Sequence, residues 1–178
     1  MRALRRALAR EERERASKAI CGKLIDVIFS SVAAAPLDGD GAVAVYLASP
    51  YEINISDFIL EMLDRGVSVV SPRWNGETYE LAKLNSLSET DLRRGPMNIL
   101  EPAEAEVVNP LKVAAWIIPG LAFTMHGDRL GYGGGWYDRL IADGKDALKI
   151  GVAHEFQILE ALPREPHDIF LNQVVTPG

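Results

Sequence analysis

Residues 129–139 contain the side chains of this sequence that are best suited to chemistry on an anion. The segment reads Arg-Leu-Gly-Tyr-Gly-Gly-Gly-Trp-Tyr-Asp-Arg, so four glycines fall within five positions, just before a predicted helix. Glycine lets backbone N–H groups crowd around an anion, and a helix N-terminus adds the positive end of its dipole. The pattern suits a phosphate, with Arg129 as a bidentate donor and Asp138 as a ligand for Mg²⁺, directly or through water.

Two well-known phosphate loops differ from this segment. No Gly-Lys-Ser/Thr follows the glycines, which excludes a Walker loop. The glycines at 131, 133 and 135 also miss the third position of the dinucleotide fingerprint. The alternative is a glycine-rich turn that only reverses the chain. The glycines alone leave the two interpretations about even, and the charged and aromatic residues around them favour a ligand loop.

Short apolar runs that alternate with helical patterns must position this segment. Strands are predicted at residues 42–47, 67–70, 78–84, 113–118, 148–152 and 174–176, and helices at 2–30, 55–65 and 136–142. The alternation predicts a single α/β domain over residues 1–178, with three layers, a mostly parallel (mixed) central sheet and helices on both faces, Rossmann-like. Ligands of such sheets gather at the carboxyl ends of the strands. Residues 95–110 hold three prolines and predict a loop-rich surface stretch.

Composition restricts the class of protein. The chain has 178 residues, is 48% hydrophobic and carries a net charge of −6, which is typical of one soluble domain. No apolar stretch approaches the roughly 20 residues of a membrane span. The single cysteine excludes an internal disulfide and fits a reducing compartment. Residues 1–23 are basic, but the acidic remainder and the absence of interleaved aromatics argue against nucleic-acid binding. A solvated helix face is favoured, with one or two arginines reaching an anionic ligand.

The glycine-rich segment resembles the signature of the 5-formyltetrahydrofolate cyclo-ligase family, also called methenyltetrahydrofolate synthetases. Further blocks that resemble this family follow in order: Tyr46-Leu47 with Glu52-Ile53, Ser71-Pro72-Arg73, Met97-Asn98-Ile99-Leu100-Glu101-Pro102, His167-Asp168 and Val174-Val175-Thr176. The resemblance covers nearly the whole chain. It implies ATP-dependent closure of 5-formyltetrahydrofolate to 5,10-methenyltetrahydrofolate, with release of ADP and phosphate through a phosphorylated formyl intermediate.

The resemblance also implies roles for individual residues and a requirement for ATP and Mg²⁺. Arg129, Tyr137 and Asp138 would be catalytic, and Asp138 would serve Mg²⁺. ATP would be bound by Arg5, Arg129, Gly131, Tyr132, Gly133, Gly134, Gly135, Trp136, Tyr137 and Asp138. The folate would be bound by Leu47, Glu52, Met97, Tyr132, Trp136 and Tyr137. We therefore expect a cytoplasmic monomer whose partners are these two small molecules, with no nucleic acid and no membrane.

The N-terminus departs from the family pattern. The family begins with a Lys-x-x-Leu-Arg helix that holds ATP phosphates, whereas residues 6–12 align better with the segment after that helix. Either this phosphate clamp is missing, or Leu4-Arg5 is the motif with Met1 in place of Lys, or the true start lies upstream of Met1. A missing clamp favours an alternative function, a non-catalytic folate- or nucleotide-binding relative that has lost turnover.

Two further positions depart from the family pattern. Thr124 and Asn172 each stand where the family usually has Asp. Both substitutions remove a carboxylate, so they bear on the activity more than on the fold.

Overall fold

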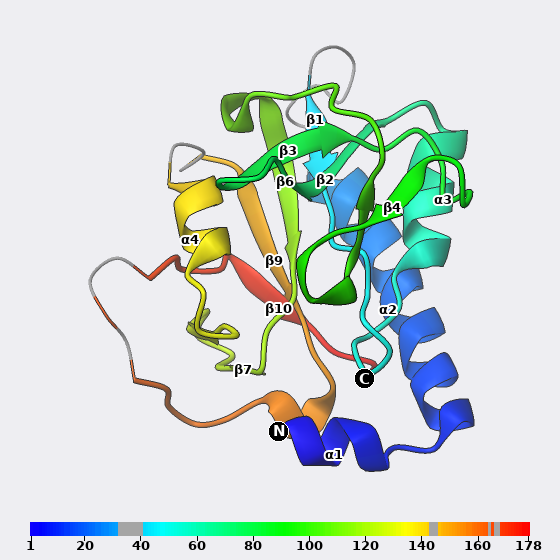
Figure 1. The fold of residues 1–178 in the computed structure, drawn as a ribbon. Coiled ribbons are helices and arrows are strands. Elements are labelled where there is room, and N and C mark those ends of the chain that lie inside the picture. The colour runs from blue at the N-terminus through cyan, green and yellow to red at the C-terminus, as the bar shows by residue number, and fades with distance from the viewer. Residues whose placement is uncertain (32–40, 143–145, 164, 166–167) are drawn as a thin grey trace.

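The computed structural model describes residues 1–31, 41–142, 146–163, 165 and 168–178, so His167 lies outside the described residues. Six strands form the central sheet in the order β10-β9-β6-β1-β2-β3 (Figure 1). They are β1 (Ala42–Ala44), β2 (Ser68–Trp74), β3 (Tyr79–Lys83), β6 (Val113–Ile118), β9 (Leu148–Val152) and β10 (Gln173–Val175). All neighbours are parallel except β3, which is antiparallel to β2. The predicted mostly parallel, mixed sheet is confirmed.

Helices cover both faces of this sheet. The helices are α1 (Arg2–Ala7), α2 (Arg10–Ser31), α3 (Ser56–Asp64) and α4 (Trp136–Ile141). Successive strand residues point to opposite faces, so Ile117 joins the core cluster under α2 and α3, while Ile118 joins the cluster under α4. Figure 1 shows α4 on the opposite side of the sheet from α2 and α3. The three-layer α/β architecture is therefore confirmed.

The N-terminal segment forms two helices, and the prediction of one helix over residues 2–30 is wrong. Leu8 ends α1 with an extended backbone, at φ −60° and ψ 134°. Arg13 donates a hydrogen bond from Nη1 to the Leu8 carbonyl at 2.7 Å, which stabilises the bend. The local residues favour a continuous helix, but the bend lets Arg5 bury its side chain against Tyr132. Tertiary contact has overridden helix propensity here.

Two small antiparallel hairpins extend from the sheet. One pairs β4 (Leu92–Arg94) with β5 (Leu100–Pro102), and the other pairs β7 (Ala122–Phe123) with β8 (Arg129–Leu130). The first hairpin adds a strand to residues 95–110, which were predicted as a loop-rich surface stretch, and buries Glu101 there. The second follows β6 directly and carries the chain into the glycine-rich segment. None of the described helices is long and apolar enough to cross a membrane.

Candidate active site

The glycine-rich segment is closed by an ion pair between its two ends. Arg129 on β8 donates from Nη2 to both carboxylate oxygens of Asp138 on α4, at 3.1 and 3.2 Å. The two side chains are only 5% and 16% exposed. Arg129 also donates to the Pro119 carbonyl at 3.3 Å, and Asp138 accepts from the backbone N–H of Ile169 at 3.3 Å. The predicted phosphate donor and the predicted metal ligand therefore contact each other directly.

Two of the glycines between them have backbone conformations that favour glycine, and the other two lie close to neighbouring side chains. Gly133 and Gly135 have φ angles of +94° and +59°, a region that L side chains rarely adopt. At Gly131 a Cβ atom would lie 2.9 Å from Arg129 Nη1, and at Gly134 it would lie 2.5 Å from the Trp136 ring. The chain-reversal interpretation thus accounts for glycine at these positions. A phosphate-binding role for the same amides stays a prediction.

A second network joins three elements that are far apart in sequence. The Tyr132 hydroxyl donates to Glu52 Oε1 and accepts from Arg5 Nη1 at 2.8 Å. Glu52 also accepts from the Ser49 N–H at 2.8 Å, which holds its carboxylate in the loop after β1. Burial, followed by the Glu52 charge, raises the pKa of Tyr132 above its ordinary value of 10.0. The hydroxyl therefore stays protonated and can keep donating to Glu52.

Arg5 brings a buried positive charge to this network. Its residue is 6% exposed, and its Cζ lies 5.5 Å from the centre of the Tyr132 ring, with Arg2 at 5.9 Å from the same ring. Among the described residues the Arg5 Nε has no hydrogen-bond partner. A buried guanidinium needs compensation, and an anionic ligand would supply it.

Tyr137 borders both networks, and Leu47 packs against the same core cluster as Tyr137. The Tyr137 ring lies 5.6 Å from Arg129 Cζ, and burial, followed by the Glu52 charge, raises the pKa of its hydroxyl. Leu47 and Tyr137 are partly buried and pack against the same core cluster. Tyr137 therefore connects the Arg129 end of the site to the side that carries Glu52.

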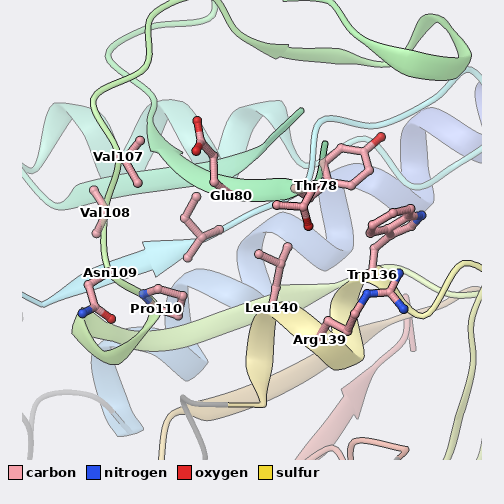
Figure 2. A pocket seen from close by; sticks show the side chains of 11 residues that line it. Thr78, Glu80, Val107, Val108, Asn109, Pro110, Trp136, Arg139 and Leu140 are labelled. Carbon is pink, nitrogen blue, oxygen red and sulfur yellow. The ribbon is translucent and has the colours of Figure 1, made fainter. Parts of the chain in front are cut away.

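Trp136 joins an aromatic cluster that the sequence analysis missed. Its ring centre lies 5.5 Å from that of Trp74 and 5.1 Å from that of Tyr79, and Arg139 covers its face at 4.2 Å. A groove of about 590 Å³ starts at this cluster and is lined further on by Leu140 and residues 107–110 (Figure 2). The Asn-Gly at positions 75–76 was an available signal of a turn, and the hairpin that turns there pairs Trp74 with Tyr79.

Met97 lies outside the buried part of the site. It sits in the turn between β4 and β5 and is 77% exposed, so its predicted contact with the folate stays a prediction. The described structure brings together the other predicted side chains except Leu47, which packs against the core: Arg5, Glu52 and Tyr132 in one network, Arg129, Asp138 and Tyr137 in the other, and Trp136 in the aromatic cluster.

The two lost carboxylates are replaced by local hydrogen bonds. Thr124 is buried, donates to Asp128 Oδ2 at 2.9 Å and accepts from the Asp128 N–H at 3.1 Å. Asn172 accepts from the Lys149 N–H at 2.7 Å through its side chain and donates its own N–H to the Lys149 carbonyl. Both residues therefore stabilise turns or strand ends.

The fit of the site to Mg²⁺ depends on Asp138. The described residues contain no group of three or more His, Cys, Asp or Glu side chains that could hold a metal ion. Mg²⁺ is commonly held by one or two carboxylates together with substrate phosphates. Both Asp138 oxygens already accept hydrogen bonds from Arg129, so this carboxylate is arranged as an arginine partner. The predicted Mg²⁺ site stays a prediction.

Comparison with known proteins places this chain and its α/β fold in one enzyme family. The sequence matches the 5-formyltetrahydrofolate cyclo-ligase family over residues 1–177, and the chain belongs to that family. It is therefore a ligase. It is 34% identical over 141 residues to the 5-formyltetrahydrofolate cyclo-ligase of Escherichia coli (strain K12), covering 76% of this chain and 78% of that protein.

Solved structures agree with this assignment. The 5,10-methenyltetrahydrofolate synthetase of Aquifex aeolicus superposes with a TM-score of 0.76 at 34% identity, covering 98% of this chain and 84% of the other. The synthetase of Mycoplasma pneumoniae superposes with a TM-score of 0.75 at 22% identity, covering 99% and 93%, and supports the fold alone. The resemblance inferred from the glycine-rich segment is confirmed.

Proposed function

We propose that this protein catalyses the ATP-dependent cyclisation of 5-formyltetrahydrofolate to 5,10-methenyltetrahydrofolate, with release of ADP and phosphate. The observation that carries the proposal is the contact of Tyr132 with both Arg5 and Glu52. It links the predicted nucleotide-binding loop and arginine to the predicted folate-binding carboxylate. A transfer between two bound substrates needs such proximity, because alignment supplies much of the rate.

The chemistry explains why both substrates must meet. The formyl oxygen is a poor leaving group, so it first attacks the γ-phosphorus of ATP, and ADP leaves with the electrons of the broken P–O bond. N10 of the folate then attacks the formyl carbon, the C–O bond breaks, and phosphate leaves while N10 loses its proton. Both steps depend on alignment and on neutralising the phosphate charge.

The residues of the site divide between these tasks. Arg5, Arg129 and the amides of Gly131, Gly133, Gly134 and Gly135 would hold the phosphates. Glu52 would accept a hydrogen bond from the folate, with Leu47, Met97 and Trp136 as apolar walls and with Tyr132 and Tyr137 between the two ligands. Mg²⁺ is the usual counter-ion of ATP, and Asp138 is the loop carboxylate that would hold it. We assign no step to the metal.

An absorbance assay tests this function, because the product has an extended chromophore that the substrate lacks. The full chain is mixed with ATP, Mg²⁺ and 5-formyltetrahydrofolate, with omission of ATP and a non-hydrolysable ATP analogue as controls. We expect absorbance to rise only in the complete mixture. Absence of any rise with a correctly folded protein would exclude the proposal.

The second candidate is a binding protein without turnover, and the observation behind it is that Met1 stands three residues before Leu4-Arg5, where the family's Lys-x-x-Leu-Arg helix has Lys. It predicts a thermal shift with ATP or with the folate and no change in absorbance. We further propose that the protein acts as a cytoplasmic monomer on these two small molecules alone. Size-exclusion chromatography with light scattering checks the monomer.

A further inference from the structure

Glu101 on β5 is a buried carboxylate that the proposed mechanism does not use. It is 3% exposed and accepts hydrogen bonds from Arg93 Nε on β4 at 2.9 Å and from the Trp74 N–H on β2 at 3.1 Å. Arg93 in turn donates from Nη2 to the Trp74 carbonyl at 2.6 Å. The Arg93–Glu101 pair thus engages both backbone groups of Trp74, the last residue of β2.

The turn that joins β4 to β5 passes close to the same carboxylate. A Cβ atom at Gly95 would clash with the Glu101 carboxylate, so a larger residue at this position would have to displace that carboxylate. Met97 and Asn98 follow with φ angles of 57° and 61°, a conformation that persists only where surrounding contacts enforce it. The Gly95 N–H donates to the Ile99 carbonyl at 2.8 Å and closes the turn.

The ring of Trp74, unlike its backbone, contacts residues of the candidate active site. Its ring contacts Trp136, which begins α4 directly after the glycines, and Tyr79 on β3, at 5.5 and 5.1 Å between ring centres. A continuous series of contacts therefore runs from the Met97 turn through Glu101 to Trp74 and on to Trp136. Strands of three residues form only a marginal hairpin by themselves, so attachment to β2 decides where β4 and β5 lie.

We propose that Glu101 is a positioning residue for the folate substrate. Together with Arg93 it fixes the Met97 turn and the Trp74 ring relative to Trp136. It thereby sets the spacing of the apolar side chains that receive the pterin or the aminobenzoyl ring of the folate. The proposal rests on the proposed function, in which Met97 and Trp136 contact the folate. Glu101 touches no reacting atom, so its loss weakens folate binding and leaves the chemical step unchanged.

Steady-state kinetics of the full chain test this role. Glu101→Ala removes the acceptor of both Arg93 and Trp74, and we expect the KM for 5-formyltetrahydrofolate to rise by roughly tenfold or more. We expect kcat and the KM for ATP to change by less than about twofold, the pattern of lost substrate binding. Glu101→Gln keeps an oxygen that accepts from the Trp74 N–H and is expected to restore part of the folate affinity. Gly95→Ala displaces the carboxylate and is expected to raise the same KM.

Glu106→Ala is the matched control, since Glu106 is exposed and pairs with Lys83 on the neighbouring β3. We expect it to leave both KM values unchanged. The proposal is overturned if folded Glu101→Ala keeps the wild-type folate KM, or if its KM values for folate and ATP rise together. Should Glu101→Ala fail to fold by circular dichroism, an unchanged folate KM in Glu101→Gln and Gly95→Ala overturns it equally. Wild-type protein without turnover overturns the proposed function and this inference together, whereas active wild type with unaffected variants overturns this inference alone.

Discussion

Two buried arginines of the candidate active site differ in how their charges are compensated. Arg129 is paired with Asp138 inside the fold, whereas Arg5 contacts a tyrosine hydroxyl and a tyrosine ring. The Nε atom of each arginine is buried and has no hydrogen-bond partner among the described residues. Among the described residues the first charge has a carboxylate partner, whereas the second contacts an uncharged hydroxyl and ring, and we propose that the ATP phosphates neutralise it. Substitution of Arg129 should therefore damage the fold and the activity together, and substitution of Arg5 the activity alone.

The largest effect is expected for Arg129→Ala. This change leaves the Asp138 carboxylate buried without its cation, which typically costs about 3 kcal/mol or more of the free energy of unfolding. We also expect cyclisation to become undetectable. Urea denaturation and the absorbance assay measure the two effects. Adding Asp138→Asn to this variant should recover part of the stability but none of the activity, and full stability in Arg129→Ala alone would contradict the comparison.

Arg5→Gln should separate activity from stability. Loss of a charged donor to phosphate is expected to lower kcat/KM for ATP by roughly tenfold to a hundredfold. The free energy of unfolding should change by less than about 1 kcal/mol, because no carboxylate loses its partner. Activity measured at increasing ATP concentration gives kcat/KM, and urea denaturation gives the free energy of unfolding. Equal destabilisation of Arg5→Gln and Arg129→Ala would remove the distinction between the two arginines.

Tyr132→Phe should have a smaller effect on both substrates. Removing the hydroxyl breaks the link between Arg5 and Glu52 but keeps both charges, so we expect kcat/KM to fall by roughly fivefold. Because the pKa of Tyr132 is raised above 10.0, the proton that it donates to Glu52 is retained as the pH rises through that value. The wild-type pH profile should therefore show no loss of activity from Tyr132 below pH 10. A fall in wild-type activity with rising pH below pH 10 that is absent in Tyr132→Phe would refute this expectation.

The smallest effect is expected for Arg10→Ala, which serves as a control for removing an N-terminal arginine. Arg10 and Glu14 are 81% and 61% exposed and pair across one turn of α2 at 2.7 Å. Exposed pairs of this kind contribute little to the free energy of unfolding, because water and salt screen the two charges. Thermal denaturation and turnover should match the wild type. A marked loss of ATP affinity would show that the basic N-terminus acts as a general charge cluster and not through Arg5.

The secondary-structure predictions succeeded where the apolar pattern of a segment matches its burial in the fold. The runs at 113–118 and 148–152 became β6 and β9 with the same bounds, because short runs dominated by apolar residues belong in the centre of a parallel sheet. The helix predicted at 136–142 is found as α4. The secondary-structure predictions were less successful where a strand is held in place by buried charged side chains. The β4–β5 hairpin depends on the buried Glu101, which resembles a surface residue in sequence.

The amino-acid sequence by itself determined the α/β class, the family and the residues of the glycine-rich segment, since these depend on local periodicity and on the order of motifs along the chain. Only the tertiary structure decided that Arg129 is paired with Asp138, that the chain bends at Leu8 and that Arg5, Tyr132 and Glu52 meet. The physical reason is that a side chain's charge state and partners depend on burial and on neighbours distant in sequence, and no local pattern encodes either.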